Sequence, residues 1–195
     1  MGRPREHDET VRAALLLAAE RLVDVGGPAA LSVRAVADDV GTTTRAVYSV
    51  FGSKAGLLEA LAIRLFEELG AAIDAIEPTD DPVADVVTAS LQGFRRIALE
   101  HASLYSLVFL RVVPDLALGP AFDAIAEATF GRLESLVSRA MNSLGVTTDI
   151  HAAQMVHALT EGLASMELRG SLGPRDDTEQ KWRSAVAALL TGLKS

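Results

Sequence analysis

The sequence predicts an all-α protein of nine to ten helices. Apolar residues recur at the 3.6-residue spacing of a helix along almost the whole chain, and short segments containing glycine or proline separate these stretches. No stretch gives a convincing strand pattern. Hydrophobic residues make up 49% of the 195 residues but aromatic residues only 5%, which suits a helical core packed with Leu, Ala and Val.

The first helix is expected to begin near Asp8, a capping residue, and to stop at the Gly26-Gly27-Pro28 sequence. Its apolar stripe consists of Val11, Ala14, Leu15, Ala18, Leu22 and Val25. Arg3 and Arg5 precede this helix. They fit either a short arm that reaches a DNA minor groove or a disordered, solvated terminus, and the sequence leaves both interpretations open.

The segment from Leu31 to Leu58 carries the most informative signals in the chain. Ser32 is placed to cap a second helix, and Leu31 and Val36 can close a hydrophobic staple over its entry. The apolar side of this helix is formed by Val33, Val36, Ala37 and Val40. Gly41 supplies the permissive backbone on which a short helix ends.

A third helix is expected immediately afterwards, because one of the three threonines at 42–44 can cap it. Val47 and Phe51 lie one turn apart on a face that can pack inward. Two helices joined by three or four residues form a helix-turn-helix. The remaining surface of the third helix carries donors that can reach base edges or phosphates: Thr43, Thr44, Arg45, Tyr48 and Ser49.

A possible phosphate site follows the third helix. Gly52 ends that helix, Ser53 can cap the next one, and Lys54 lies in its first turn. The N–H groups at a helix start have no partner within the helix, and the helix dipole adds positive charge there. Together with the Lys54 ammonium group, they predict an anion site.

The rest of the chain predicts further helices. Their expected extents are 53–77, 82–98, 102–113, 121–144, 149–168 and 178–192. Pro78 ends the first of these, Asp81 followed by Pro82 is a helix-start signal, and Pro114 ends the helix over 102–113. Residues 114–120 are expected to form a loop.

Charge and composition narrow the function classes. The net charge is -8, but residues 1–54 hold seven basic and seven acidic side chains, so the whole excess of negative charge lies after Lys54. The amino-terminal part is therefore the end that repels DNA least. There is no cysteine for a disulfide or a thiolate metal site. The charged start and the lack of an apolar run of about 18 residues favour a cytoplasmic protein that does not span a membrane.

The first sixty or so residues resemble the DNA-binding domain of the TetR/AcrR family of transcriptional regulators. The residues that carry this resemblance are Leu31, Arg34, Ala37, Gly41, Thr43, Ala46, Val47, Tyr48, Phe51, Ser53, Lys54, Leu57 and Leu58. The resemblance implies base-facing positions at Arg34, Thr44, Arg45, Ala46 and Ser49, and phosphate-facing positions at Thr43, Tyr48 and Lys54. Ser49 and Val50 stand where many members carry a basic or aromatic pair, so the operator sequence stays open.

The resemblance also implies an organisation for the whole chain. Residues 1–55 would form the helix-turn-helix DNA-binding domain, and residues 56–195 a helical domain for ligand binding and dimerisation. The last two helices would pair with those of a second copy through apolar and small residues: Ile150, Met155, Ala158, Leu159, Gly162, Leu163, Met166, Trp182, Val186, Leu189, Leu190 and Leu193. The alternative is that these residues form an ordinary core within one chain. A homodimer would read a pseudo-palindromic operator in double-stranded DNA.

An effector site is implied in the carboxy-terminal domain. Its candidate residues are Phe94, Leu104, Tyr105, Phe109, Phe122, Phe130 and His157, which would line a mostly apolar cavity unless they are core. We expect a hydrophobic or amphiphilic small molecule to bind there and to lower operator affinity by changing the tilt of the long helix that starts at Ser53.

Other function classes find little support. The chain contains no phosphate-binding Gly-rich loop, no HExxH and no GxSxG, so we expect no catalytic residue and no cofactor. His157 and Glu161 share a helix face, but two potential ligands without a third predict no metal site. The alternative to a DNA-binding regulator is a helical protein-interaction module of the same fold that no longer binds DNA, which the acidic balance and Asp38 and Asp39 suggest.

Overall fold

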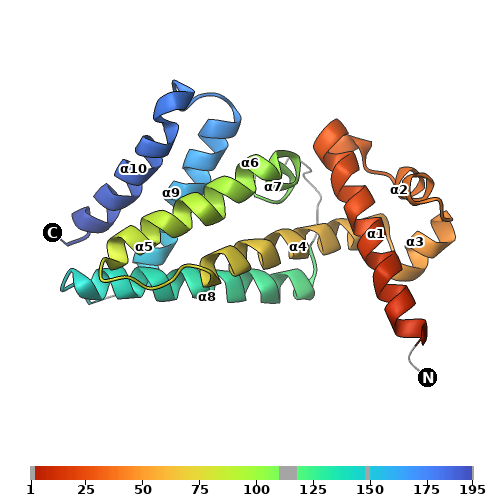
Figure 1. Cartoon of the computed structure of the whole chain (residues 1–195), viewed down its shortest axis with the longest axis horizontal. Coiled ribbons are helices and arrows are strands. Elements are labelled where there is room, and N and C mark those ends of the chain that lie inside the picture. Colours follow the sequence, from red (N-terminus) through yellow and green to blue (C-terminus); the bar gives the residue numbers. More distant parts are fainter. Residues whose placement is uncertain (1–2, 110–117, 148–149, 195) are drawn as a thin grey trace. The chain divides into compact units, whose positions relative to one another are not determined.

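The computed structural model describes residues 3–109, 118–147 and 150–194, and these residues form helices and no strand (Figure 1). The all-α prediction is confirmed. The α-helices are α1 (Arg3–Gly26), α2 (Val33–Val40), α3 (Thr44–Phe51), α4 (Lys54–Asp74), α5 (Pro82–Ala89), α6 (Arg96–Glu100), α7 (Ala102–Val108), α8 (Pro120–Ser143), α9 (Ile150–Leu168) and α10 (Thr178–Gly192). The expected end of the helix over 102–113 and the expected start of the helix over 149–168 lie outside the described residues.

The chain folds into two compact units. The first comprises residues 1–65 and 103–123, and the second comprises residues 66–102 and 124–195. Helices α4 and α8 each begin in the first unit and continue into the second. The sequence-based boundary between residues 55 and 56 falls at the start of α4, and it stays a prediction about function.

In the first unit, α1 packs against α2, and α2 packs against α3 (Figure 1). Leu15, Ala18 and Val23 of α1 are buried, as are Val36 and Ala37 of α2. The backbone of α1 begins at residue 3, before the expected start near residue 8, so the two amino-terminal arginines belong to a helix and not to an extended arm.

In the second unit, α5 begins as predicted, because the Asp81 side chain accepts a hydrogen bond from the N–H of Ala84. The expected single helix over 82–98 is interrupted by a π-helical segment, Ser90–Arg95, which joins α5 to α6. Gly93 lies within this segment. A Cβ atom there would lie 3.5 Å from Leu69 Cδ1 of α4, which is an ordinary van der Waals distance, so the packing of this segment on α4 does not require a glycine.

A buried carboxylate connects α5 to α8. Asp85 is 2% exposed. Its carboxylate accepts hydrogen bonds from the Thr79 N–H at 3.0 Å and from the Thr79 hydroxyl at 2.7 Å. It also forms an ion pair with Arg139 at 2.5 Å. Burial alone would raise the pKa of Asp85, but the bonds from Thr79 and the charge of Arg139 outweigh it and lower the pKa. Asp85 is therefore held as a paired carboxylate.

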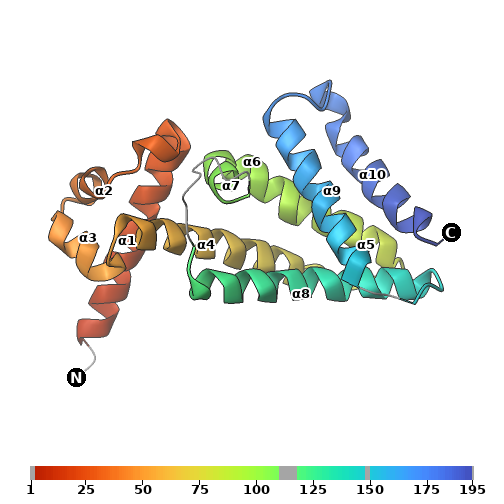
Figure 2. The ribbon, with the colours of Figure 1, turned by 180° about the vertical axis from the view of Figure 1, so that it is seen from behind.

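Helices α9 and α10 run side by side in the second unit (Figures 1 and 2). Trp182, Val186 and Leu190 are fully buried, and Leu163 is 8% exposed. For these four residues the structure corrects the expectation of a face towards a second chain, because they form part of the chain's own core. Three other candidates are exposed large apolar residues, namely Ile150, Met155 and Met166.

Within the described part of the chain, no single helix is both long and apolar enough to cross a bilayer. Helices α3 and α4 together meet that length and composition test, but they are bent by 61° at their junction. Their apolar residues Val47, Leu57, Leu61 and Leu65 are buried in the protein.

Candidate nucleic-acid interface

Helix α2 has the start and the end that its sequence predicts. The Ser32 hydroxyl accepts a hydrogen bond from the N–H of Ala35 at 3.1 Å, and Leu31 and Val36 are fully buried at the entry. Gly41 ends the helix with φ at 72°, in the left-handed region that a Cβ atom disfavours. The N–H of Thr42 then donates a hydrogen bond to the carbonyl oxygen of Ala37 at 2.8 Å, which closes the turn.

Helix α3 starts only three residues after α2 ends. The Thr43 hydroxyl accepts a hydrogen bond from the N–H of Ala46 at 3.2 Å, so Thr43 is the cap among the three threonines. Val47 is 1% exposed and anchors α3 against the core. Phe51 is half-buried, and the Arg12 guanidinium of α1 lies 5.6 Å from its ring centroid in a cation–π contact. These contacts fix α3 with its opposite face outward.

The predicted contact residues lie on exposed surfaces. Tyr48 is 51% exposed, and Ala46 is half-buried. The other exposed members are Arg34, Thr43, Thr44, Arg45, Ser49 and Lys54. Hydroxyl and guanidinium groups can donate to base edges in a major groove, while phenol and ammonium groups can bond to phosphates.

Nearby cations compensate two acidic residues at the end of α2. Arg21 of α1 pairs with Asp39 at 2.5 Å, and Arg34 lies 3.8 Å from Asp38. Sequence reasoning identified the two aspartates as a possible obstacle to DNA binding, and it missed the role of Arg21. The arrangement reduces the negative charge beside α3.

The turn between α3 and α4 holds the residues of the predicted anion site, which stays a prediction. Gly52 has φ at 72°, and the Ser53 hydroxyl accepts a hydrogen bond from the N–H of Gly56 at 3.0 Å. Lys54 is the first residue of α4. A Cβ atom at position 56 would lie 2.1 Å from the carbonyl oxygen of Phe51, so only glycine allows this close approach. The start of α4 thus presents helix-start N–H groups beside an ammonium group, as phosphate binding requires.

An ion pair fixes the first half of α4 to α1. The Arg64 guanidinium lies 3.4 Å from the Glu20 carboxylate, whose residue is only 8% exposed. Sequence reasoning missed this pair, because the two residues are 44 positions apart and no local pattern joins them. The pair joins the middle of α4 to α1 within the first unit.

The candidate effector residues divide into two groups. In the second unit, the His157 ring lies edge-on to Phe94 at 6.0 Å and to Phe130 at 6.1 Å between ring centroids. Burial lowers the pKa of His157, and Glu161 opposes this effect. The other four candidates lie in the first unit: Leu104, Tyr105, Phe109 and Phe122. A cavity shared by all seven stays a prediction.

Among the four candidates of the first unit, the Tyr105 and Phe109 rings stack at 4.3 Å between centroids, and Tyr105 and Leu104 are buried. Phe122 follows near the start of α8 and is half-buried. Burial and stacking are features that core aromatics share with ligand-binding ones. Phe94 and Phe130 differ from these four in that their rings flank a polar one, His157, which could contact the polar group of an effector.

Two groups of side chains carry donor atoms of the kind that bind metal ions. His157 Nε2 lies 3.7 Å from Glu161 Oε2. Among the described residues of the second unit, Glu68, Glu100 and His101 place ligand atoms within 4.8 Å of one another, which sequence spacing did not reveal. Arg96 bonds to both of these glutamates, at 3.4 and 2.6 Å. The arginine therefore already balances the negative charge that a cation would require.

Two family profiles match the sequence. The profile of "Bacterial regulatory proteins, tetR family" matches residues 15–61, which include α2, α3 and the start of α4. The profile of "Tetracyclin repressor-like, C-terminal domain" matches residues 87–189, which is more than half of the chain.

Individual proteins are similar as well. An HTH-type transcriptional regulator of Mycobacterium tuberculosis is 28% identical over 143 residues, covering 65% of this chain and 60% of the relative. The chain therefore spans about 60% of the length of the curated relatives that it matches. A tetR-family transcriptional regulator from Streptomyces coelicolor has the same fold, with 22% identity, coverage of 93% of this chain and 80% of the other, and a TM-score of 0.74.

A second similar structure holds a ligand. The transcriptional regulator FadR from Bacillus subtilis, in complex with stearoyl-CoA, superposes with a TM-score of 0.75 at 15% identity. The match covers 92% of this chain and 98% of FadR. At such identity the likeness concerns the fold.

Proposed function

Because the chain belongs to the TetR family of bacterial regulatory proteins, we propose that it is a ligand-responsive repressor that binds a pseudo-palindromic operator as a homodimer. The family consists of DNA-binding transcriptional regulators and not of enzymes, and this chain is a DNA-binding regulator of that kind. Its place of action is then the cytoplasm, where an operator is accessible, and the function needs no cofactor.

One observation carries the DNA-binding part of this proposal. The capped helix α3 lies three residues after α2, with Arg45, Tyr48 and Ser49 exposed on it and Lys54 at the start of the next helix. A recognition helix with exposed donors, followed by an anion-binding helix start, suits a duplex better than a protein partner. The net charge of -8 does not oppose this, since residues 1–54 are balanced.

Base-facing and phosphate-facing residues should respond differently to substitution. Lys54→Ala should weaken binding to every duplex by about tenfold and reduce the slope of log affinity against log salt by about one. Arg45→Ala should cost about 1–3 kcal/mol on the operator and relax the preference at one base position. Fluorescence anisotropy with a selected operator and a scrambled duplex, over a series of salt concentrations, measures both effects.

Lys194→Ala is the matched control for these variants, because Lys194 is an exposed lysine after α10. It should leave affinity and salt slope unchanged. If Lys54→Ala and Arg45→Ala also behave like the unchanged protein, or if that protein prefers no duplex at low salt, the chain is the interaction module and the proposed repressor function is wrong.

The homodimer is proposed from the outward faces of α9 and α10. The exposed apolar and small residues of these two helices are here called the outward face. They are Met155, Ala158, Gly162, Met166, Ser184, Ala188 and Gly192. Nothing lies within 4 Å of a Cβ placed at either glycine, so a second chain can approach the backbone there. Exposed apolar residues that lie along adjacent helices with small neighbours favour helix packing against a second copy.

The effector is proposed to be an amphiphilic molecule that contacts Phe94, Phe130 and His157. These residues combine two apolar rings with one polar ring that burial keeps neutral near pH 7. The stearoyl-CoA in FadR supports an amphiphilic ligand for this fold. Helix α4 runs through both units, so a change in its tilt can alter the separation of the two recognition helices in a dimer.

An effector that acts in this way should lower operator affinity by about 5- to 150-fold, the usual range of allosteric coupling. Long-chain acyl-CoAs, beginning with stearoyl-CoA, are the first probes in an operator-binding titration. Phe130→Ala should shift the titration to higher ligand concentration, whereas Leu99→Ala, at an exposed position, should not. A probe that binds the second unit but leaves operator affinity unchanged would disprove this mechanism.

A further inference from the structure

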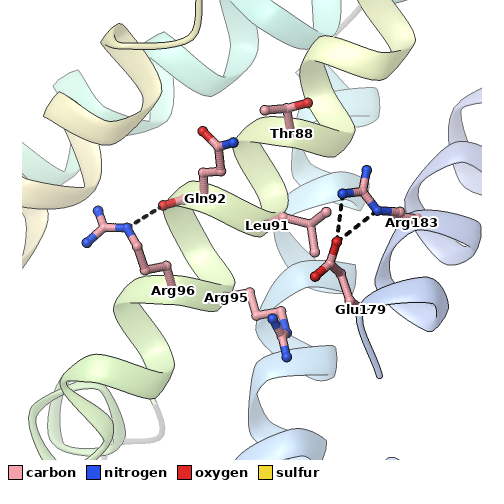
Figure 3. Close-up of a pocket in the computed structure, with 7 residues that line it drawn as sticks. All are labelled: Thr88, Leu91, Gln92, Arg95, Arg96, Glu179 and Arg183. Carbon is pink, nitrogen blue, oxygen red and sulfur yellow. Dashed lines mark hydrogen bonds and ion pairs between the residues drawn. The ribbon is translucent and has the colours of Figure 1, made fainter. Parts of the chain in front are cut away.

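A pocket of about 270 Å³ lies between α10 and the run from α5 through the π segment to α6 (Figure 3). Three of its seven lining residues are arginines, Arg95, Arg96 and Arg183, and the single acidic one is Glu179. All of them belong to the second unit. This concentration of guanidinium groups is unexpected there, because the excess negative charge of the chain lies after residue 54.

Arg95 is fixed in place before any ligand binds. Its Nε and Nη2 donate to the two carboxylate oxygens of Glu167, at 3.1 and 2.8 Å. The same carboxylate accepts a hydrogen bond from Trp182 Nε1 at 2.8 Å. A guanidinium group has five N–H donors, so the side-on pair with Glu167 leaves the Nη1 end of Arg95 for a second acceptor. A cation held in this way loses little conformational entropy when it binds an anion.

Arg183 is free to adjust. Its Nε and Nη2 both donate to Glu179 Oε1, at 3.1 and 2.7 Å, across one turn of α10. Both side chains are about half exposed, and exposed pairs of this kind contribute little stability. Arg183 can therefore leave Glu179 for a ligand in the pocket. Figure 3 shows this pair on α10, with the arginines of the π segment and α6 on the opposite side of the pocket.

The pocket also offers apolar contact and additional charge. Leu91 lies between the charged groups of the two sides and is 9% exposed, and Thr88 lies one turn before it (Figure 3). Arg96 uses Nε to bond to the Gln92 carbonyl oxygen and Nη1 to bond to Glu68 and Glu100. Its contribution to the pocket is therefore mainly long-range charge. π-helical segments are also frequent at binding sites.

We propose that this pocket binds a small oxyanion, the carboxylate or phosphate group of a short ligand, between Arg95 and Arg183. The ligand's apolar part, if it has one, lies on Leu91. The volume is slightly below the usual range for drug-sized ligands, so it suits a short acid or a phosphate ester better than a long acyl chain. This site is separate from the proposed effector contacts around His157 and does not depend on DNA binding.

Calorimetric titration of the full chain tests the site directly. The probes are inorganic phosphate, butyrate and chloride at constant ionic strength and pH. We expect phosphate or butyrate to bind with one site per chain and a dissociation constant on the order of 1 mM, and to raise the melting temperature, with chloride giving neither effect. Phosphate alone would identify a phosphate ester as the ligand class, and butyrate alone would identify a carboxylic acid.

Three variants make the test specific. Arg183→Gln should weaken binding of the active probe by about tenfold, and Glu179→Gln should strengthen it several-fold because it releases Arg183. Arg169→Gln is the matched control, since Arg169 is an exposed arginine near the end of α9 that does not line the pocket. Absence of binding by phosphate and butyrate, or equal loss in Arg183→Gln and Arg169→Gln, would overturn the proposal.

Discussion

Replacing Glu167 by alanine is expected to lower the free energy of unfolding by about 3–5 kcal/mol, because the change leaves a largely buried cation and a buried indole N–H without their acceptor. Glu167 receives two hydrogen bonds from Arg95 and one from Trp182, all between 2.8 and 3.1 Å. Trp182 is fully buried, and the side chains of Arg95 and Glu167 are 23% and 14% exposed. The network joins α9, α10 and the π segment.

Two further substitutions separate charge from hydrogen bonding. Glu167→Gln keeps an acceptor for Trp182 but loses the ion pair with Arg95, so about half of the destabilisation is expected. Glu179→Ala removes an exposed partner on α10 and should cost no more than about 0.5 kcal/mol. Trp182 is the single tryptophan of the chain, so its fluorescence during urea unfolding reports on the second unit. If Glu167→Ala is as stable as Glu179→Ala, the network has no structural role.

The helix-turn-helix could be predicted from the sequence because its determinants are local. Ser32 and Thr43 each accept a hydrogen bond from an N–H three residues ahead, and Gly41 and Gly52 adopt positive φ where their helices end. Such features depend on residues within one turn of each other, and capping and glycine preferences describe them well. The eight candidate DNA contacts follow from the same short segment, and their roles remain predictions.

Features that depend on tertiary contacts could not be predicted. The apolar period of 82–98 is compatible with one continuous helix, and it contains no signal for the π segment at Ser90–Arg95. The periodicity of α10 identified Trp182 as apolar-facing but could not say that its own chain covers it. Glu167 and Arg95 are 72 positions apart in the sequence, so no local pattern joins them. The arginine pocket could not be predicted for the same reason, because Glu167 holds Arg95 in place there. Periodicity gives a face for each helix, and packing decides what that face meets.

The sequence likewise gives an apolar face for α9 but does not say which surface covers it. If a second copy covers that face, a charge placed there should prevent dimer formation. Gly162→Arg places a long cation in the centre of the outward face of α9. Nothing lies within 4 Å of the new Cβ, and arginine favours a helix more than glycine does, so each chain should fold normally. The buried charge in a close helix interface should nevertheless prevent assembly.

Light scattering after size-exclusion chromatography should then give the 20.6 kDa mass of one chain for Gly162→Arg, and twice that mass for the unchanged protein. A monomer contacts one half-site only, so operator affinity should fall by about 100-fold or more, because the two half-sites no longer act through one dimer. Ala128→Arg is the control, since it adds the same charge at an exposed position on α8. A Gly162→Arg protein that remains dimeric would place the interface elsewhere on the chain.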